Sequence, residues 1–177
     1  MDLASIMVKF ASEFSGVMWL FLWVLGALIG TLYIGGALLR LFRSHSVQGS
    51  PPVTVGEILP VILVGGLMAN LSSFINATWN SFSSGAVSYG PIAYEGAADF
   101  GKFADATNAV LTLASIAGGV FFMRGVMLLK RSAMEGHSSG GSEDTTWRAI
   151  THMLFGSVLV QIPDAIDGFR STFGLFW

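Results

Sequence analysis

The stretch Asn108–Arg131, NAVLTLASIAGGVFFMRGVMLLKR, decides how the rest of the chain is interpreted. It is apolar, rich in small residues and closed by a basic pair. A related stretch, Val17–Arg43, closes in the same way with Arg40 and Arg43. We therefore interpret the chain as two copies of one unit, which consists of a membrane helix, a short basic turn and a shorter second helix.

The composition is that of a membrane protein. Of 177 residues, 53% are hydrophobic and 11% are charged, whereas soluble domains have about 25% charged residues; the mean hydropathy is +0.66. The length predicts one compact domain. The absence of cysteine excludes disulfides and thiolate metal sites, and a net charge of −2 argues against a general nucleic-acid binder.

The first apolar helix is predicted over Val17–Leu39, an uncharged stretch long enough to span a bilayer. Before it, residues 1–14 place apolar side chains at helical spacing and predict a short amphipathic helix on the membrane or a neighbour. A plain extension of the next helix is the alternative. Asp2 and Glu13 argue against a cleaved signal peptide, unless the chain is already a mature product.

Three further apolar segments follow. Val55–Phe74 is weaker and either spans (over 58–74) or packs inside protein, Asn108–Leu129 is a clear membrane helix, and residues 149–162 form a short segment interrupted by Pro163. Small residues at helical spacing allow close approach of helices. The residues expected to do so are Gly26, Gly30, Gly65, Gly66, Ala114 and Gly118.

An internal repeat supports this division. An offset of 90 residues aligns Gly35–Arg40 with Gly125–Lys130, and an offset of 91 aligns Gly65 with Gly156 and Asn70 with Gln161. The predicted fold is an all-α membrane protein with two tandem helical hairpins, residues 1–82 and 108–177, joined by a connector, residues 83–107. Independent convergence of two ordinary membrane hairpins is the alternative.

The charges predict a topology. Both turns begin with basic residues and the connector is acidic, so the turns are expected in the cytoplasm with the connector and both ends outside. Arg124 lies within an apolar run, where it either snorkels to the basic end or binds a lipid phosphate or lines a polar cavity. The basic residues expected to face lipid or a lumen are Arg40, Arg43, Arg124, Lys130 and Arg131.

The sequence contains no constellation typical of catalysis, neither a phosphate-binding loop nor a nucleophile motif nor a metal-ligand motif. We therefore predict no enzyme, no catalytic residue and no metal site. Asp164 and Asp167 are spaced to share a proton or a cation, although acids at a helix end are usually solvated or capping. A small transporter remains an alternative, but ionisable residues inside the apolar segments are nearly absent.

One pattern combines a small-residue helix, Leu-Leu-Lys-Arg, a Gly-rich polar turn and an apolar helix broken by proline. It resembles the TraQ / IcmC (DotE) family of I-type plasmid conjugation and type IVB secretion membrane proteins. The resemblance is carried by Ala114–Arg131 and Leu154–Phe169. It implies a component of the bacterial inner membrane in a conjugation or effector-export apparatus.

The chain also looks like two fused conjugative pilins, each of them two apolar helices joined by a basic cytoplasmic loop. That likeness implies a subunit that polymerises with phospholipid into a pilus, with the basic residues facing a lumen or lipid headgroups. The expected partners are further copies of the chain, other secretion-system membrane proteins and phospholipid, with transferred DNA or protein only through a lumen. A non-polymerising inner-membrane scaffold or channel component is the alternative.

Overall fold

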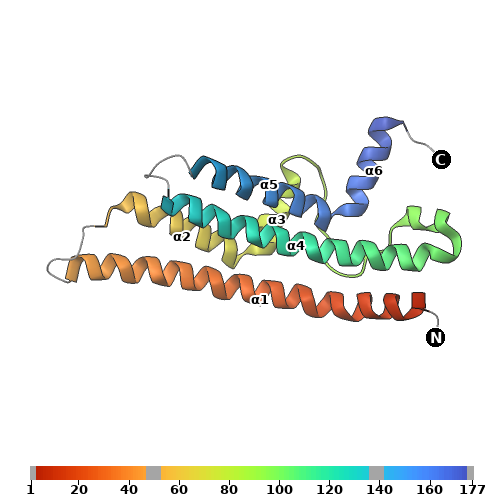
Figure 1. The fold of residues 1–177 in the computed structure, drawn as a ribbon, viewed down its shortest axis with the longest axis horizontal. Helices are drawn as coiled ribbons and strands as arrows, with labels where there is room; N and C mark the ends of the chain where they lie inside the picture. The colour runs from red at the N-terminus through yellow and green to blue at the C-terminus, as the bar shows by residue number, and fades with distance from the viewer. Residues whose placement is uncertain (1–2, 47–52, 136–141, 175–177) are drawn as a thin grey trace.

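The computed structural model describes residues 3–46, 53–135 and 142–174 (Figure 1). These residues contain helices and no strand. The elements are α1 (Leu3–Ser46), α2 (Val55–Ala69), α3 (Leu71–Asn80), the 3-10 helix η1 (Glu95–Phe103), α4 (Ala104–Glu135), α5 (Ser142–Val160) and α6 (Ile162–Phe173). Two stretches, Ser5–Ser46 and Glu95–Met134, are long and apolar enough to cross a membrane, and the number rises to four if each bent pair of helices is one span. The prediction of an all-helical membrane protein is confirmed at this level.

The first 46 residues contain one long helix. The separate amphipathic helix predicted over residues 1–14 is wrong and the alternative, a plain extension of the next helix, is confirmed, because α1 continues from Leu3 through Gly16 without a break. A single buried stripe explains the continuity: Ala11, Ser15, Trp19 and Leu22 lie at helical spacing and are all buried against the bundle. The N-terminal turns therefore pack on the same surface as the apolar span that follows them.

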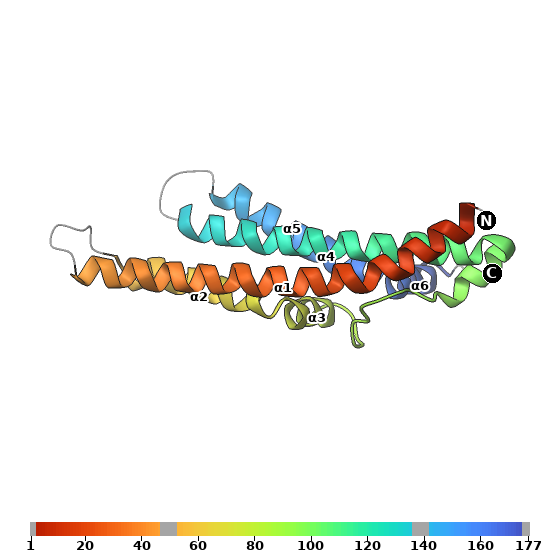
Figure 2. The same ribbon diagram turned by 90° about the horizontal axis from the view of Figure 1, so that it is seen from below.

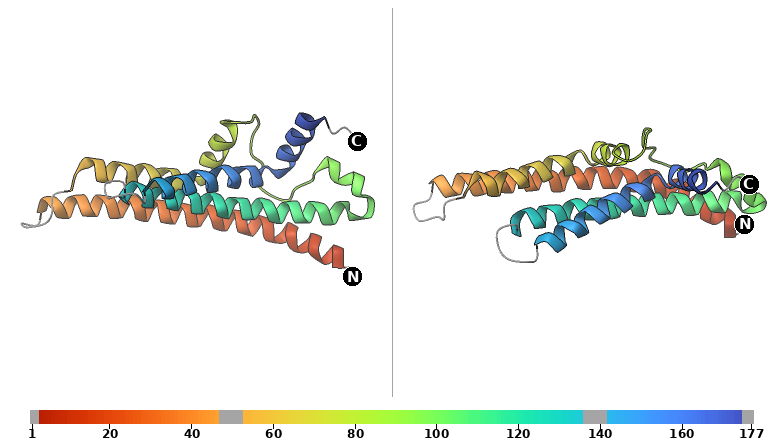
Figure 3. Two further views of the ribbon diagram at one scale, coloured as in Figure 1. Left: turned by 45° about the horizontal axis from the view of Figure 1, so that its top comes forward. Right: turned by 90° about the horizontal axis from the view of Figure 1, so that it is seen from above.

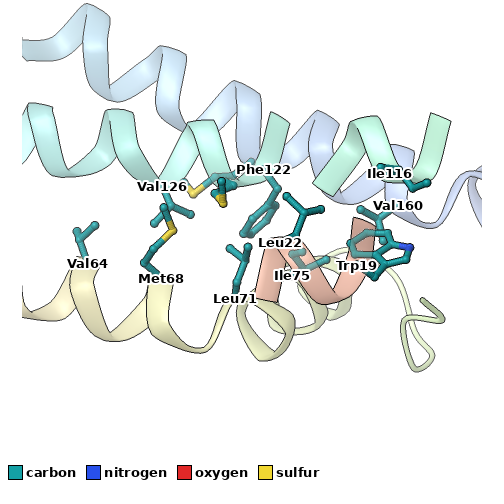
Figure 4. Close-up of a cluster of buried hydrophobic side chains, with 12 residues drawn as sticks. Trp19, Leu22, Val64, Met68, Leu71, Ile75, Ile116, Phe122, Val126 and Val160 are labelled. Carbon is teal, nitrogen blue, oxygen red and sulfur yellow. The ribbon is translucent and has the colours of Figure 1, made fainter. Parts of the chain in front are cut away.

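The helices form two antiparallel pairs, α1 with α2 and α4 with α5, and α4 lies between α1 and α5 (Figures 1 and 2). The burial of the two long helices differs accordingly: 22% of the apolar window in α1 is buried, against 56% in α4. The main core lies between the pairs, where Met68 points towards Val126 and Leu71 towards Phe122 (Figure 4). α4 is thus the central helix, and α1 has an outer face without cover.

Glycines set the distance within each pair. A Cβ at Gly30 would lie 2.5 Å from the carbonyl oxygen of Gly65, and a Cβ at Gly118 would lie 2.7 Å from that of Gly156. Real Cβ atoms do not come so close, so at these crossings backbone touches backbone. A glycine–glycine contact of the same kind therefore joins α1 to α2 and α4 to α5.

Other contacts of the two pairs correspond as well. The side chain of Ile34 lies against Gly65, and the backbone of Phe122 lies against Gly156. Because Gly30 and Gly118 are 88 residues apart, and so are Ile34 and Phe122, the structural offset between α1 and α4 is 88. The offset of 90 expected from sequence aligns the basic ends, whereas the glycine crossings are 88 residues apart, and the repeat itself stays a prediction.

Each pair also ends in a sharp bend (Figure 3). α2 and α3 meet at 93° and α5 and α6 at 91°. The bends lie at Asn70 and Gln161, whose φ and ψ angles are −118°, 55° and −106°, 45°, and these are the two residues that the offset of 91 aligns. The expected continuity of Val55–Phe74 is wrong, whereas the expected break near Pro163 occurs two residues earlier, with the proline in the first turn of α6.

The second pair is displaced along the bundle axis relative to the first (Figure 1). With the offset of 88, Gly119 is the counterpart of Thr31, yet it packs against Trp19, twelve residues earlier in α1. α1 and α4 run in the same direction (Figure 2). At 1.5 Å per residue the displacement is roughly 18 Å.

The connector is fixed by side chains of the helices. Its backbone N–H groups donate as follows: Val87 to Asn76 Oδ1 (3.1 Å), Ser88 to Gln161 Oε1 (3.3 Å), Ile92 to Thr112 Oγ1 (2.9 Å) and Tyr94 to Asn108 Oδ1 (3.0 Å). An extended segment without a sheet needs such partners, because unpaired backbone groups are costly away from water. The last part of the expected connector is helical, in η1 and in the start of α4 at Ala104.

Glycine-to-alanine substitutions test the crossings. We expect Gly30→Ala and Gly118→Ala each to lower the stability in detergent by about 1–3 kcal/mol, because the added methyl group meets backbone. Gly66→Ala is the matched control: it lies in the same helix as Gly65 but has open space around it, so it should be neutral or stabilising by up to about 1 kcal/mol. Thermal unfolding followed by circular dichroism measures both, and equal losses at all three positions would contradict backbone contact at the crossings.

A second substitution tests the connector. Gln161 is buried, accepts from Ser88 N–H and donates to the Ala86 carbonyl oxygen (3.4 Å). We expect Gln161→Leu to cost about 1–3 kcal/mol and to speed hydrogen exchange at Ser88. Asn70→Leu changes the exposed residue at the corresponding bend and should leave connector exchange unaltered. Unchanged exchange at Ser88 in the first variant would show that the connector is held by other contacts.

Candidate functional site

The basic end of the bundle begins with an ion pair between α1 and α2. Arg40 Nη2 donates to Glu57 Oε2 at 2.8 Å, and Thr54 Oγ1 donates to Glu57 Oε1 at 3.2 Å. Both charged side chains are about half exposed, and such pairs contribute about 0–1 kcal/mol. The pair therefore orients the two helix ends and neutralises Arg40 more than it stabilises the fold.

Lys130 joins the second helix pair to the first at the same end. Its Nζ lies 3.8 Å from the centroid of the Tyr33 ring, so α4 meets α1 through a cation–π contact. This contact leaves all three N–H donors of the ammonium group without a carboxylate partner among the described residues. Arg43 and Arg131 are exposed near the ends of α1 and α4.

A cleft opens between these residues. It has a volume of about 150 Å³ and lies between α1, α2 and the end of α4. Its lining residues are Leu32, Tyr33, Gly36, Ala37, Arg40, Glu57, Ile58, Val61, Lys130 and Met134. A second, wider depression of about 430 Å³ adjoins it and shares Arg40, Glu57 and Met134. Charged groups thus lie at the rim of a mostly apolar cleft, an arrangement that suits an amphiphile with an anionic head.

Arg124 lies apart from this cleft, on the exposed face of α4. Its neighbours in the helix, Met123, Gly125 and Val126, are buried towards the bundle. The interpretation that Arg124 lines a cavity inside the bundle is therefore wrong for a single chain. A helical Cβ points towards the N-terminus, so Arg124 must turn back along its own helix to reach the basic end.

The opposite end of the bundle is polar and aromatic. Tyr94 OH donates to Asp167 Oδ1 at 2.8 Å and accepts from Arg170 Nη1 at 3.2 Å. Asp164 instead accepts from Gln161 Nε2 at 2.9 Å, so the two aspartates do not share a proton or a cation. The described residues contain no group of three potential metal ligands.

An aromatic cluster lies beside the connector. Tyr89 packs edge-on against Trp19 and Trp23, with ring centroids 4.9 Å and 4.8 Å away. Its hydroxyl donates to the Ser72 carbonyl oxygen at 2.9 Å, and burial raises the pKa of this phenol. Trp and Tyr concentrate at membrane–water boundaries, and this cluster has the composition typical of such a boundary.

Four of the six residues expected at helix contacts lie there, and two do not. Gly26, Gly30, Gly65 and Gly118 lie at helix contacts, whereas Gly66 faces open space and Ala114 is half-buried. Close contacts are also made by three glycines that the sequence did not mark as packing residues, namely Gly119, Gly125 and Gly156. Gly156 could have been found, because the repeat aligns it with Gly65. Gly119 could not, because its partner Trp19 lies in the other helix pair.

Comparison of the chain with protein-family models, with curated proteins and with solved structures finds no match. Its function therefore has to follow from the geometry and from the sequence pattern.

The basic end predicts the topology in the membrane, and the lack of native cysteine makes the test clean. We expect an impermeant maleimide to label Ser83→Cys but not Ser46→Cys in bacterial spheroplasts. Replacing Arg40, Arg43, Lys130 and Arg131 by glutamate should reverse or scramble this pattern, because positive charge is retained in the cytoplasm. Lys102→Glu, a charge reversal outside the basic end, is the control. Unaltered labelling after the fourfold change would refute the assignment.

Proposed function

We propose that the chain is a structural, non-enzymatic subunit of a bacterial conjugation or type IV secretion apparatus, inserted in the inner membrane and able to polymerise as a pilin. One observation carries the proposal, the outer face of α1. Its large apolar residues Val17, Leu20, Val24, Leu28 and Leu32 are 55–68% exposed. An apolar face of this length needs lipid or another protein to cover it. A subunit whose apolar face is covered by lipid before assembly and by another subunit afterwards fits an assembling system.

The tandem-hairpin architecture belongs to this proposal. It is supported by the matched glycine crossings, Gly30 with Gly65 and Gly118 with Gly156. The nearly equal bends at Asn70 and Gln161 support it as well. Two units of one design within a chain form a short piece of a repeating structure, and repeating structures extend by adding units.

The proposed apparatus rests on the resemblance to the TraQ / IcmC (DotE) family. The residues that carry it fall in α4, with its basic end, and in the bent pair α5–α6. Both are helical elements of the kind that a membrane component of such a system requires. A scaffold that stays in the inner membrane would use the same apolar faces for other membrane proteins and would not form filaments.

We further propose phospholipid as the structural ligand of the basic end. The cleft is lined by Lys130 together with the apolar side chains of Leu32, Val61 and Met134, and the ammonium group of Lys130 lies over the ring of Tyr33. An anionic headgroup would meet Lys130 while its acyl chains followed α1. Arg40 contributes less, because Glu57 already neutralises it.

Lipid retention distinguishes these two cations. We expect Lys130→Gln to reduce co-purifying phosphatidylglycerol more than Arg40→Gln does, measured by native mass spectrometry after exchange into a zwitterionic detergent. Lys102→Gln, on η1 away from the cleft, should retain the wild-type amount. Equal retention in all three variants would exclude a lipid site at the basic end.

The proposed function is tested by electron microscopy of material sheared from expressing cells, with mass spectrometry to identify the chain. We expect this chain to be the main component of a filament in a conjugation-proficient strain. Recovery only from the inner membrane would contradict polymerisation and favour the scaffold.

A further inference from the structure

We propose that copies of this chain join head to tail by repeating, between chains, the contact that its own two hairpins make with each other. The inference rests on the proposed function, since it names the surface by which a structural subunit would polymerise. The partner is a second copy of the chain. Counterpart residues of the two hairpins are 88 apart between α1 and α4, and 91 apart between α2–α3 and α5–α6.

The first hairpin has a joining face that is buried by the second. Leu22 is 1% exposed and Val64 is 4% exposed. Their counterparts in the second hairpin are Val110 and Phe155, which are 52% and 67% exposed. The second hairpin thus keeps an apolar version of the joining face, and no other described part of the chain covers these two side chains.

The second hairpin has a receiving face, which is buried by the first. Ile116 is 4% exposed and Val126 is fully buried on the side of α4 that faces α1 and α2. Their counterparts in α1 are Leu28, which is 55% exposed, and Leu38, which is also exposed. The part of α1 around Leu28 and Leu38 is therefore the receiving face of the first hairpin, without an occupant.

The arms of the two hairpins, which are the helices α3 and α6 beyond the bends, also differ in burial. α3 packs on α5 and has three buried residues, Leu71, Ile75 and Trp79. α6, its counterpart, has none and projects away from the bundle (Figures 1 and 3). The hydrogen bonds of Tyr94 to Asp167 and Arg170 fix α6 in this direction. An arm held outward in this way can reach α2 of a following copy as α3 reaches α5.

These faces predict particular contacts between chains. Within one chain Leu22 packs on Gly119, and Lys130 lies on Tyr33. The counterparts of Leu22 and Gly119 are Val110 and Thr31, so Val110 of one copy is expected against Thr31 of the next. Both are exposed. The contact joins the second hairpin of one copy to the first hairpin of the next, so it is heterologous and leaves a free face at each end for a further copy.

The same two residues cannot meet within a chain. Because Lys130 lies beside Tyr33, residue 110 lies twenty residues along α4 from the level of Tyr33, roughly 30 Å away, and Thr31 is only two residues from Tyr33. A disulfide needs Cα atoms about 4.4–6.8 Å apart. A disulfide between cysteines at these positions therefore reports two chains.

The experiment uses the full chain, which has no native cysteine. We expect the double variant Val110→Cys/Thr31→Cys to give, on oxidation, a ladder of dimers, trimers and higher species, both in sheared filaments and in concentrated detergent solution. An equimolar mixture of the two single variants should stop at dimers, because each chain then has only one reactive end.

The matched control is Val110→Cys/Leu32→Cys. Leu32 is adjacent to Thr31 and exposed, but its counterpart Val120 is exposed and not buried between the hairpins. We expect little or no ladder from this pair. Ladders of equal strength from both double variants would show unspecific association and overturn the inference.

The outcomes separate the inference from the proposed function. Filaments that contain the chain but yield no ladder from the first double variant would leave the pilin function standing and overturn the head-to-tail contact. A ladder in detergent from a chain that never forms filaments would support the contact and overturn polymerisation. Loss of both filament and ladder would overturn both.

Discussion

The whole architecture depends on the crossing of helices at glycine. Where Gly30 meets Gly65 and Gly118 meets Gly156, the backbones are in contact, and no other residue fits between them. In lipid there is little hydrophobic driving force between helices, so close packing and backbone proximity must hold each pair together. The crossing also fixes the register of the pair. That register in turn places the bends at Asn70 and Gln161 and the start of each arm.

The sequence predicted the helices well because apolar runs and glycine spacing are local signals. It also aligned Asn70 with Gln161, which proved to be the two bend positions. It did not predict a bend near 90° at Asn70, since no proline or glycine marks that residue. It separated the N-terminal turns from α1, because the alternation of polar and apolar residues hid the stripe through Ala11 and Ser15.

The candidate site could be predicted only in part, because its geometry depends on contacts between helices that are far apart in the sequence. The basic residues and their common end of the bundle follow from the charge pattern. Their unequal state does not, because it depends on partners in other helices: Arg40 is paired with Glu57, whereas Lys130 rests on an aromatic ring. The connector shows this dependence most clearly. Its hydrogen-bond partners Asn76, Asn108, Thr112 and Gln161 are spread over the bundle, and nothing in their local sequence marks them as a set.

The displacement of the second hairpin along the bundle axis limits where an assembly can grow. One step from hairpin to hairpin is roughly 18 Å, so a head-to-tail neighbour, two steps on, is shifted by roughly 36 Å. The hydrocarbon layer of a bilayer is about 30 Å thick. In the proposed head-to-tail assembly, two joined chains whose bundle axes cross the bilayer would therefore not both fit the same hydrocarbon layer. The proposal thus implies that a subunit leaves the bilayer when it joins an assembly, and that a neighbouring chain then covers apolar surface that lipid tails covered before.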